Sequence, residues 1–278
     1  MLEMFAFDFM QRALLAGIMV SILCGFIAFF VVLKRLSFIG VGISHSALGG
    51  VAIGVLSGVD PILSAIIFVI LMSWAIGMVS KKGDVHEDTA IGIFFSFATA
   101  LGVALISLSK SYNVDLFGYL FGSILSVTKK DLWTVGILGG LVVGFLILFF
   151  KELLFMCFDE EVATISGLPV TFLYYLLLTL MAVTIVVAIK VVGIVLVSAF
   201  IVIPAATGYQ LAKSYRIMLT TSILCGIVAS VAGLWLSFRF DLASGATIVL
   251  CSTLLFFLAM LISPRRRLLQ RTLNRFSP

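Results

Sequence analysis

Charged residues are scarce in this sequence. Only 11% of its 278 residues are Asp, Glu, Lys or Arg, whereas 62% are hydrophobic. A water-soluble domain needs polar side chains over much of its surface, so this composition excludes an ordinary soluble fold. A helix needs about 20 mostly apolar residues to cross a bilayer, and such stretches follow one another along almost the whole chain. The sequence predicts an all-α membrane protein with one transmembrane domain over residues 1–278.

Residues that bind metals or carry out catalysis are also few. The chain has two histidines and four cysteines, and the cysteines show neither CxxC metal spacing nor a disulfide framework. The GxxxxGK[ST] loop that binds nucleotide phosphates is absent, and so is the HExxH pair of metalloproteases. We therefore expect a protein that is not an enzyme and that holds no permanent cofactor.

Basic residues beside the apolar runs predict which loops are cytoplasmic, because Lys and Arg accumulate on that side. The markers are Lys34–Arg35, Lys81–Lys82, Lys151, Lys213 with Arg216, and the basic tail 264–278, which we expect to meet anionic lipid rather than nucleic acid. The N-terminus is then outside. We predict eight or nine membrane helices, with apolar runs near 13–33, 38–56, 61–79, 89–108, 132–150, 171–189, 191–212, 217–237 and 244–263.

One apolar segment is too short to cross the membrane. Residues 116–127 (LFGYLFGSILSV) would extend only about 18 Å as a helix, less than the hydrocarbon thickness. We predict a short re-entrant or interfacial helix there, and a connector lying on the membrane surface is the alternative. This topology leaves Lys129 and Lys130 outside, against the usual preference for basic residues in the cytoplasm.

The second predicted span carries a histidine between two serines, Ser44, His45 and Ser46. An ionisable side chain at membrane depth indicates function by default, and imidazole is a common ligand of transition metals. The alternative is a histidine that only donates a hydrogen bond to a neighbouring helix. One imidazole is not a metal site, so a second His45 across the axis of a homodimer, together with water, would have to add ligands. We predict that these three residues line a metal path.

Small residues recur every four positions on the same span. Gly42, Ser46, Gly50 and Gly54 form one helical face, along which another helix can approach closely. Pro204 in a later span is interpreted either as a packing kink or as a hinge. We assign the three glycines and Pro204 to helix packing or gating.

An acidic segment near residues 157–169 interrupts the apolar runs and predicts a short cytoplasmic helix followed by a turn. Acidic residues favour a helix N-terminus, and Gly167 suits the end of the helix. Such a helix could dock on another protein, and an ordinary solvated connector is the alternative. The residues concerned are Phe158, Asp159, Glu160, Glu161, Ala163 and Gly167.

Four stretches of the chain resemble the zinc and manganese permease family of bacterial ABC importers. They are RLSFIGVGISHSALGGVAIG at 35–54, YLFGSILSV at 119–127, FDEEVATISGLP at 158–169 and VVGIVLVSAFIVIPAATGYQLA at 191–212. The resemblance implies a multi-pass permease of the bacterial inner membrane with a type II ABC importer-like fold. It also implies a homodimer, cytoplasmic ATP-binding subunits that contact residues 158–167, an extracytoplasmic metal-binding protein, and alternating access.

The resemblance also bears on the transported ion, Zn²⁺ or Mn²⁺. Family members often carry an aspartate four residues before the histidine, where this chain has Val41. The loss of a hard oxygen ligand favours zinc over manganese, because imidazole suits zinc well.

Three acids, Asp60, Asp115 and Asp241, fall at the outer ends of spans. They could form an electronegative mouth that attracts a cation.

A transporter driven by an ion gradient is the competing interpretation. Such transporters usually need several acidic or basic residues buried in their spans to couple the two fluxes. This chain offers almost none, so we favour a permease driven by a separate ATPase.

Overall fold

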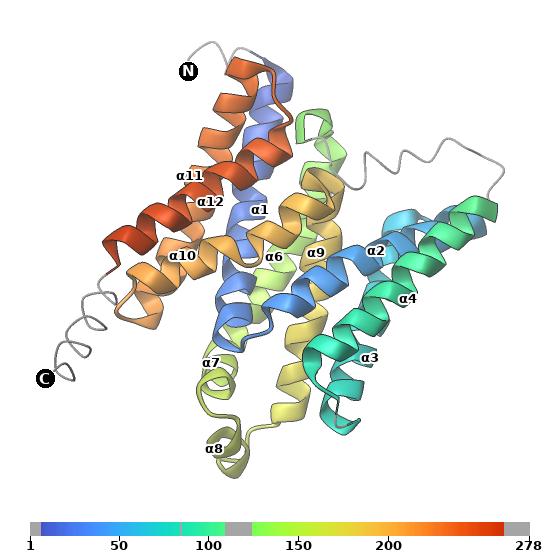
Figure 1. Ribbon diagram of the computed structural model, residues 1–278, viewed down its shortest axis with the longest axis vertical. Coiled ribbons are helices and arrows are strands. Elements are labelled where there is room, and N and C mark those ends of the chain that lie inside the picture. Colours follow the sequence, from blue (N-terminus) through green and yellow to red (C-terminus); the bar gives the residue numbers. More distant parts are fainter. Residues whose placement is uncertain (1–6, 84, 109–123, 264–278) are drawn as a thin grey trace, which may run out of the picture.

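The computed structural model describes residues 7–83, 85–108 and 124–263, and within these ranges the chain is helical apart from short turns (Figure 1). Eight helical segments are long and apolar enough to cross a membrane, which confirms the predicted all-α multi-pass class. They are α1 (Asp8–Leu33), α2 (Ser37–Ser57), α3 (Pro61–Lys82), α4 (Glu87–Leu108), α6 (Lys129–Leu148), the run Val170–Leu211, α11 (Tyr215–Phe240) and α12 (Ser244–Ile262).

The run Val170–Leu211 is too long for one crossing. Its 42 residues would extend about 63 Å as a straight helix, twice the hydrocarbon thickness. Gly193 interrupts it with φ 81° and ψ 165°, a conformation that glycine adopts without steric cost. In Figure 1 the chain rises through most of α9 (Val170–Phe200) and then turns back obliquely through α10 (Ile203–Leu211). The sequence predicted that the two apolar runs meet at residue 190, whereas the structure places the break at Gly193.

The interior of the bundle is formed by a minority of the helices. α1, α2 and the α9–α10 run are 67%, 67% and 72% buried over their most apolar windows, whereas α3, α4, α6 and α12 are 17–28% buried. The outer helices still carry large apolar side chains, such as Leu254 and Phe257, on their exposed faces. Because hydrocarbon is the surrounding solvent, these faces need no polar residues.

The segment after α6 contains two short helices, where the sequence predicted a single cytoplasmic helix near 157–169. α7 spans Phe150–Phe158 and α8 spans Glu160–Ile165, and the extended backbone of Asp159 separates them. Aromatic packing explains the additional helix, because the ring of Phe150 lies 6.1 Å from that of Phe29 and 5.5 Å from that of Phe30 on α1. The apolar side of α7 is thereby held against the bundle.

The segment before α6 is described only in its last part. Residues 109–123 lie outside the described residues, and with them most of the predicted re-entrant helix 116–127; the basic tail 264–278 lies outside them too. Ile124 begins a single 3₁₀ turn, Ile124–Ser126, and is buried beside α1 near Gly17. Lys129 and Lys130 begin α6 at the end of the molecule opposite α7 and α8, as the predicted topology requires (Figure 1).

Candidate functional site

His45 lies at membrane depth on α2. It follows the first residue of the helix, Ser37, by eight positions, which corresponds to a rise of about 12 Å from the N-terminal end of the helix. The imidazole is half-buried and packs edge-on against Phe95 of α4, with the ring centroids 5.1 Å apart. The ring is therefore neither sealed in the core nor fully exposed to lipid.

The face of α2 around His45 carries no second ionisable side chain. Val41, one turn earlier, is half-buried, and Phe38 is 63% exposed. Within the described ranges no group of three or more His, Cys, Asp or Glu side chains could hold a metal ion. A metal site at His45 therefore needs ligands from outside this part of one chain.

The two neighbouring serines are buried and bonded within their own helix. The hydroxyl of Ser44 donates to the carbonyl of Gly40 at 2.9 Å, and the hydroxyl of Ser46 donates to the carbonyl of Gly42 at 2.8 Å. Such bonds satisfy a hydroxyl donor in an apolar environment. Their assignment to the metal path stays a prediction.

Glycines bring α2 unusually close to α3 and α4. A Cβ built at Gly50 would lie 2.6 Å from the Cα of Ala65 on α3, and one at Gly42 would lie 2.5 Å from the Cγ2 of Ile91 on α4. These distances leave no room for a side chain, as expected where small residues let helices meet. His45 is therefore carried by a tightly packed unit of three helices.

Pro204 lies at the start of α10 and is buried. Proline is well tolerated in the first turn of a helix, since its missing N–H would have no intrahelical partner there. The gating role assigned to it stays a prediction.

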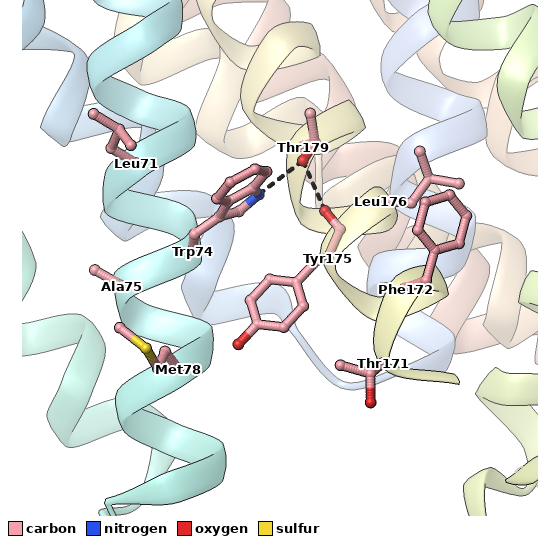
Figure 2. A pocket seen from close by; sticks show the side chains of 9 residues that line it. All are labelled: Leu71, Trp74, Ala75, Met78, Thr171, Phe172, Tyr175, Leu176 and Thr179. Carbon is pink, nitrogen blue, oxygen red and sulfur yellow. Dashed lines mark hydrogen bonds between the residues drawn. The ribbon is translucent and has the colours of Figure 1, made fainter. Parts of the chain in front are cut away.

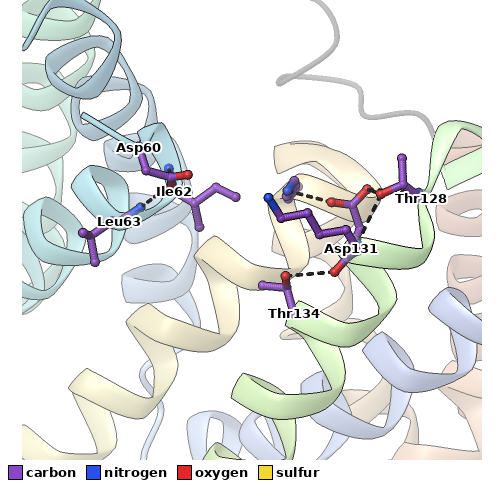
Figure 3. Close-up of polar contacts among 8 residues, drawn as sticks. Asp60, Ile62, Leu63, Thr128, Asp131 and Thr134 are labelled. Atoms are coloured by element: carbon purple, nitrogen blue, oxygen red, sulfur yellow. Dashed lines mark hydrogen bonds and ion pairs between the residues drawn. The ribbon is translucent and has the colours of Figure 1, made fainter. Parts of the chain in front are cut away.

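The acids predicted to form an outer mouth lie apart. The carboxylate of Asp60 accepts hydrogen bonds from the amides of Ile62 at 2.9 Å and Leu63 at 3.1 Å, and so caps α3 (Figure 3). Asp241 ends α11 in a left-handed conformation, close to the N-terminal end of α1 and far from the α2–α3 turn (Figure 1). Asp115 lies outside the described residues.

A different acid, Asp131, makes an ion pair at the end of the bundle opposite α7 and α8 (Figure 1). One of its oxygens lies 2.6 Å from the Nζ of Lys190, three residues before the break at Gly193. Its other oxygen accepts from the backbone amide and hydroxyl of Thr128, which caps α6 (Figure 3). The pair joins the start of α6 to the place where α9 bends.

Glu160, at the start of α8, binds two lysines from different membrane helices. It forms ion pairs with Lys34 after α1 and with Lys81 at the end of α3, the second at 2.7 Å. Glu87 at the start of α4 interacts electrostatically with both lysines. Desolvation tends to raise the pKa of Glu160, but the hydrogen bonds and charges of the two lysines hold it below its usual value. We call Lys34, Lys81, Glu87 and Glu160 the inner ionic cluster.

The opposite side of α8 is apolar and exposed. Val162 and Ile165 are 45% and 86% exposed, and Phe158 at the end of α7 is 67% exposed, whereas Ala163 is buried against the bundle. The carboxylate of Asp159 caps the helix by accepting from the amide of Val162 at 3.0 Å, and Glu161 is exposed.

Gly167 ends α8 in a left-handed conformation with φ 81°. The amide of Leu168 donates to the carbonyl of Ala163, and that of Gly167 to the carbonyl of Thr164, which together form a Schellman motif. The helix is thus held rigidly in place with an apolar surface directed away from the membrane helices.

An apolar groove of about 760 Å³ lies between α3 and the first half of α9 (Figure 2). Two of its polar side chains are bonded, since the indole N–H of Trp74 donates to the hydroxyl of Thr179 at 2.9 Å and that hydroxyl donates to the carbonyl of Tyr175. The lining holds hydroxyls but no carboxylate, imidazole or thiol, so the groove is unsuited to a metal ion.

Several of these contacts could not be read from the sequence. Lys34 and Lys81 served only as markers of the cytoplasmic side, yet they meet Glu160 from positions 126 and 79 residues away. Asp131 and Lys190 were not singled out at all. The one available signal for Asp131 was the Thr128-to-Asp131 spacing, which is typical of a helix cap.

Residues 6–263 match the model of a family described as the ABC 3 transport family. The manganese transport system membrane protein MntC of Listeria monocytogenes is 41% identical over 263 residues, which cover 95% of this chain and 94% of that protein. The manganese import system permease protein ScaB of Streptococcus gordonii is 41% identical over 268 residues, 95% of each. A solved structure, PsaBC from Streptococcus pneumoniae in complex with Fab, is similar with a TM-score of 0.86 at 38% identity, covering 96% of both chains.

Proposed function

The chain belongs to the ABC 3 transport family, and from that premise we propose that it is the permease subunit of an ATP-driven importer of divalent transition metal ions. It is a multi-pass protein of the bacterial inner membrane, and its relatives are transport permeases rather than enzymes. The observation that carries the proposal is a half-buried imidazole at membrane depth in a chain otherwise nearly devoid of ionisable residues in its spans.

The exposed side of α8 supports a partner that binds ATP. Phe158 at the end of α7, together with Val162 and Ile165 on the well-capped α8, exposes large apolar side chains outside the membrane helices, which suits insertion into a groove of another protein. In this proposal a cytoplasmic ATPase subunit covers that surface, and an extracytoplasmic metal-binding protein delivers the ion at the opposite end. ATP binding would then move α8 and switch the bundle between outward and inward access.

A homodimer would complete the metal site. The described part of one chain supplies a single histidine at this depth, whereas metal sites usually have three or four ligands. Two copies related by a twofold axis through the His45 face would bring two imidazoles together, with water as the remaining ligands.

The relatives and this chain's own residues lead to different expectations for the transported ion. The names of the relatives favour manganese, whereas Val41 leaves the His45 face without a carboxylate and favours zinc. The second argument rests on this chain's own residues, so we propose that zinc is carried at least as well as manganese.

The decisive experiment compares the two histidines of the chain. Purified protein is reconstituted into vesicles with its ATPase partner, and ATP-dependent uptake of zinc and manganese is measured for His45→Ala and for His86→Ala. His86 is exposed in the α3–α4 turn and serves as the matched control. We expect His45→Ala to lower uptake by about tenfold or more, since even changes in the second shell of a metal site have effects of that size. Equal uptake by both variants would remove His45 from the path.

The choice of ion is tested by restoring an acid. Val41→Asp places a carboxylate one helical turn from the imidazole, on the same face. We expect the ratio of manganese to zinc uptake to rise, because Mn²⁺ prefers oxygen ligands. If wild-type protein carried manganese and excluded zinc, our assignment of the ion would be wrong.

The same vesicles test transport driven by an ion gradient. Uptake that followed a proton gradient and ignored ATP would support that alternative, although the described spans hold few charged groups with which to couple the two fluxes.

A further inference from the structure

The inner ionic cluster lies where two helices of the proposed metal path begin. Lys34 belongs to the three-residue connection between α1 and α2, and Lys81 is the next-to-last residue of α3. Glu160 binds both lysines. One carboxylate on α8 is thus attached to the connection that leads into α2 and to the last turn of α3, the helix that precedes α4.

The connection between α1 and α2 is short. Arg35 has φ 61°, and the amide of Leu36 donates to the carbonyl of Val31 at 2.8 Å, so the turn is closed by hydrogen bonds. Leu36 is buried, which leaves α2 little freedom relative to Lys34. A displacement of Lys34 is therefore passed on to α2 rather than absorbed by a flexible loop.

The second lysine of the cluster also contacts an aromatic ring on another helix. The ammonium of Lys81 lies 4.1 Å from the centre of the Tyr174 ring on α9, which provides a cation–π contact in addition to the ion pair. Glu87, the first residue of α4, interacts electrostatically with both lysines. The negative charge of Glu87 at the start of α4 is therefore attracted to both lysines, although no ion pair within the described residues joins it to either of them.

The two helices that leave this cluster carry the two rings of the proposed path. His45 follows the start of α2 by eight residues and Phe95 follows the start of α4 by eight residues, so each ring lies about 12 Å along its helix from the helix start, and the two rings pack together. A movement of α8 that acts on both helix starts would change the position of this ring pair.

We propose that Glu160 is a positioning residue that transmits the movement of α8 to α2 and α4 through Lys34 and Lys81, and so sets the geometry around His45. The inference rests on the proposed function and deepens it, because it assigns the transmission of movement to one of two neighbouring acids. Glu160 faces the membrane helices, whereas Glu161 is exposed on α8.

The test measures how many metal ions are carried per ATP hydrolysed in vesicles that contain the permease and its ATPase partner. We expect Glu160→Gln and Lys81→Gln each to lower this ratio about fivefold while ATP hydrolysis continues, a change within the range reported for residues of coupling networks. Lys81→Arg keeps the charge and should restore most of the ratio.

Lys82→Gln is the matched control, because Lys82 is the adjacent lysine of α3 and makes no ion pair within the described residues. An unchanged ratio for Glu160→Gln would overturn the inference. So would a proportional loss of hydrolysis and uptake, or loss of the ATPase on purification, since either result would assign the cluster to assembly alone. If Glu160→Gln fails to fold, Lys81→Gln against Lys82→Gln decides by the same criteria.

The two proposals fail in distinguishable ways. Absence of ATP-dependent metal uptake by the wild-type protein would remove the importer function before any variant is compared. Normal uptake by the wild type, with the same ratio in Glu160→Gln, would leave the function standing and remove only the role of Glu160.

Discussion

Two helices of this protein are rich in glycine and use it differently. On α2, side chains at Gly50 and Gly54 would collide with the backbone of α3, with closest Cα distances of 2.6 and 2.8 Å. On α6, Gly140 and Gly144 have the same spacing, yet a Cβ at either position would meet nothing within 4 Å. Glycines four residues apart therefore allow a close helix contact, but a neighbouring helix has to be present to make it.

The largest effect should come from filling the closest contact. Gly50→Leu would push a branched side chain into the Cα of Ala65, which cannot move away without displacing α3. We expect a loss of more than about 3 kcal/mol in the free energy of unfolding, beyond the usual cost of overpacking, or no folded protein at all. The measurements are the yield of monodisperse protein in detergent and its thermal midpoint.

The matched control for that experiment is Gly140→Leu on α6, which adds the same side chain to an open face. It should be near neutral, because leucine is as apolar as the surrounding lipid. Equal destabilisation by both substitutions would contradict the contrast between the two helices.

A smaller effect is expected where the obstacle is a side-chain methyl group rather than backbone. Gly42→Ala would place its methyl group against the Cγ2 of Ile91, a branch methyl that can withdraw only if the side chain or the helix shifts. We expect destabilisation by about 1–2 kcal/mol together with reduced metal uptake, because the contact joins α2 to α4 one turn below His45. Normal uptake at lowered stability would show that this contact serves packing only.

A slight gain should follow from Gly144→Ala on α6. Alanine is the better helix former by up to about 1 kcal/mol, and there is room for its methyl group. The thermal midpoint should stay constant or rise, and the molar mass in detergent, measured by light scattering, should not change. A dimer that separated on this substitution would show that α6 is packed in the assembly, and the difference between the two helices would disappear.

The weakest response should be to pH, which distinguishes ionic contacts from glycine packing. The pKa of Glu160 lies below its ordinary value of 4.5, so its contribution is present above that pH and is lost as the pH falls through the lowered pKa. We expect this contact to contribute fully to the free energy of unfolding from pH 8 down to about 5.5. In stronger acid the wild type should lose that contribution, so its free energy of unfolding should decline more than that of Glu160→Gln. A decline of the same size in wild type and Glu160→Gln would show that other groups are responsible.

Much of the fold could be predicted because long apolar runs have few alternatives. The predicted run 244–263 corresponds to α12 at Ser244–Ile262, and the predicted run 13–33 corresponds to α1 at Asp8–Leu33. The boundary before the last part of α9 was predicted at residue 190 instead of at Gly193, since neither the valines nor the isoleucines around Gly193 indicate a turn. α7 was missed for a different reason, because its stability depends on the contact of Phe150 with Phe29 and Phe30.

Composition alone determined that this chain is a membrane protein with many helices, and charge and position predict which helix ends face the cytoplasm and which histidine lies at membrane depth. These properties follow from the transfer of each side chain between water and hydrocarbon, which depends on residue type. Only the tertiary structure decided which glycines are packed, that Glu160 meets Lys34 and Lys81, and that His45 meets Phe95. Such contacts join residues far apart in the chain, so they depend on how helices pack rather than on any local pattern.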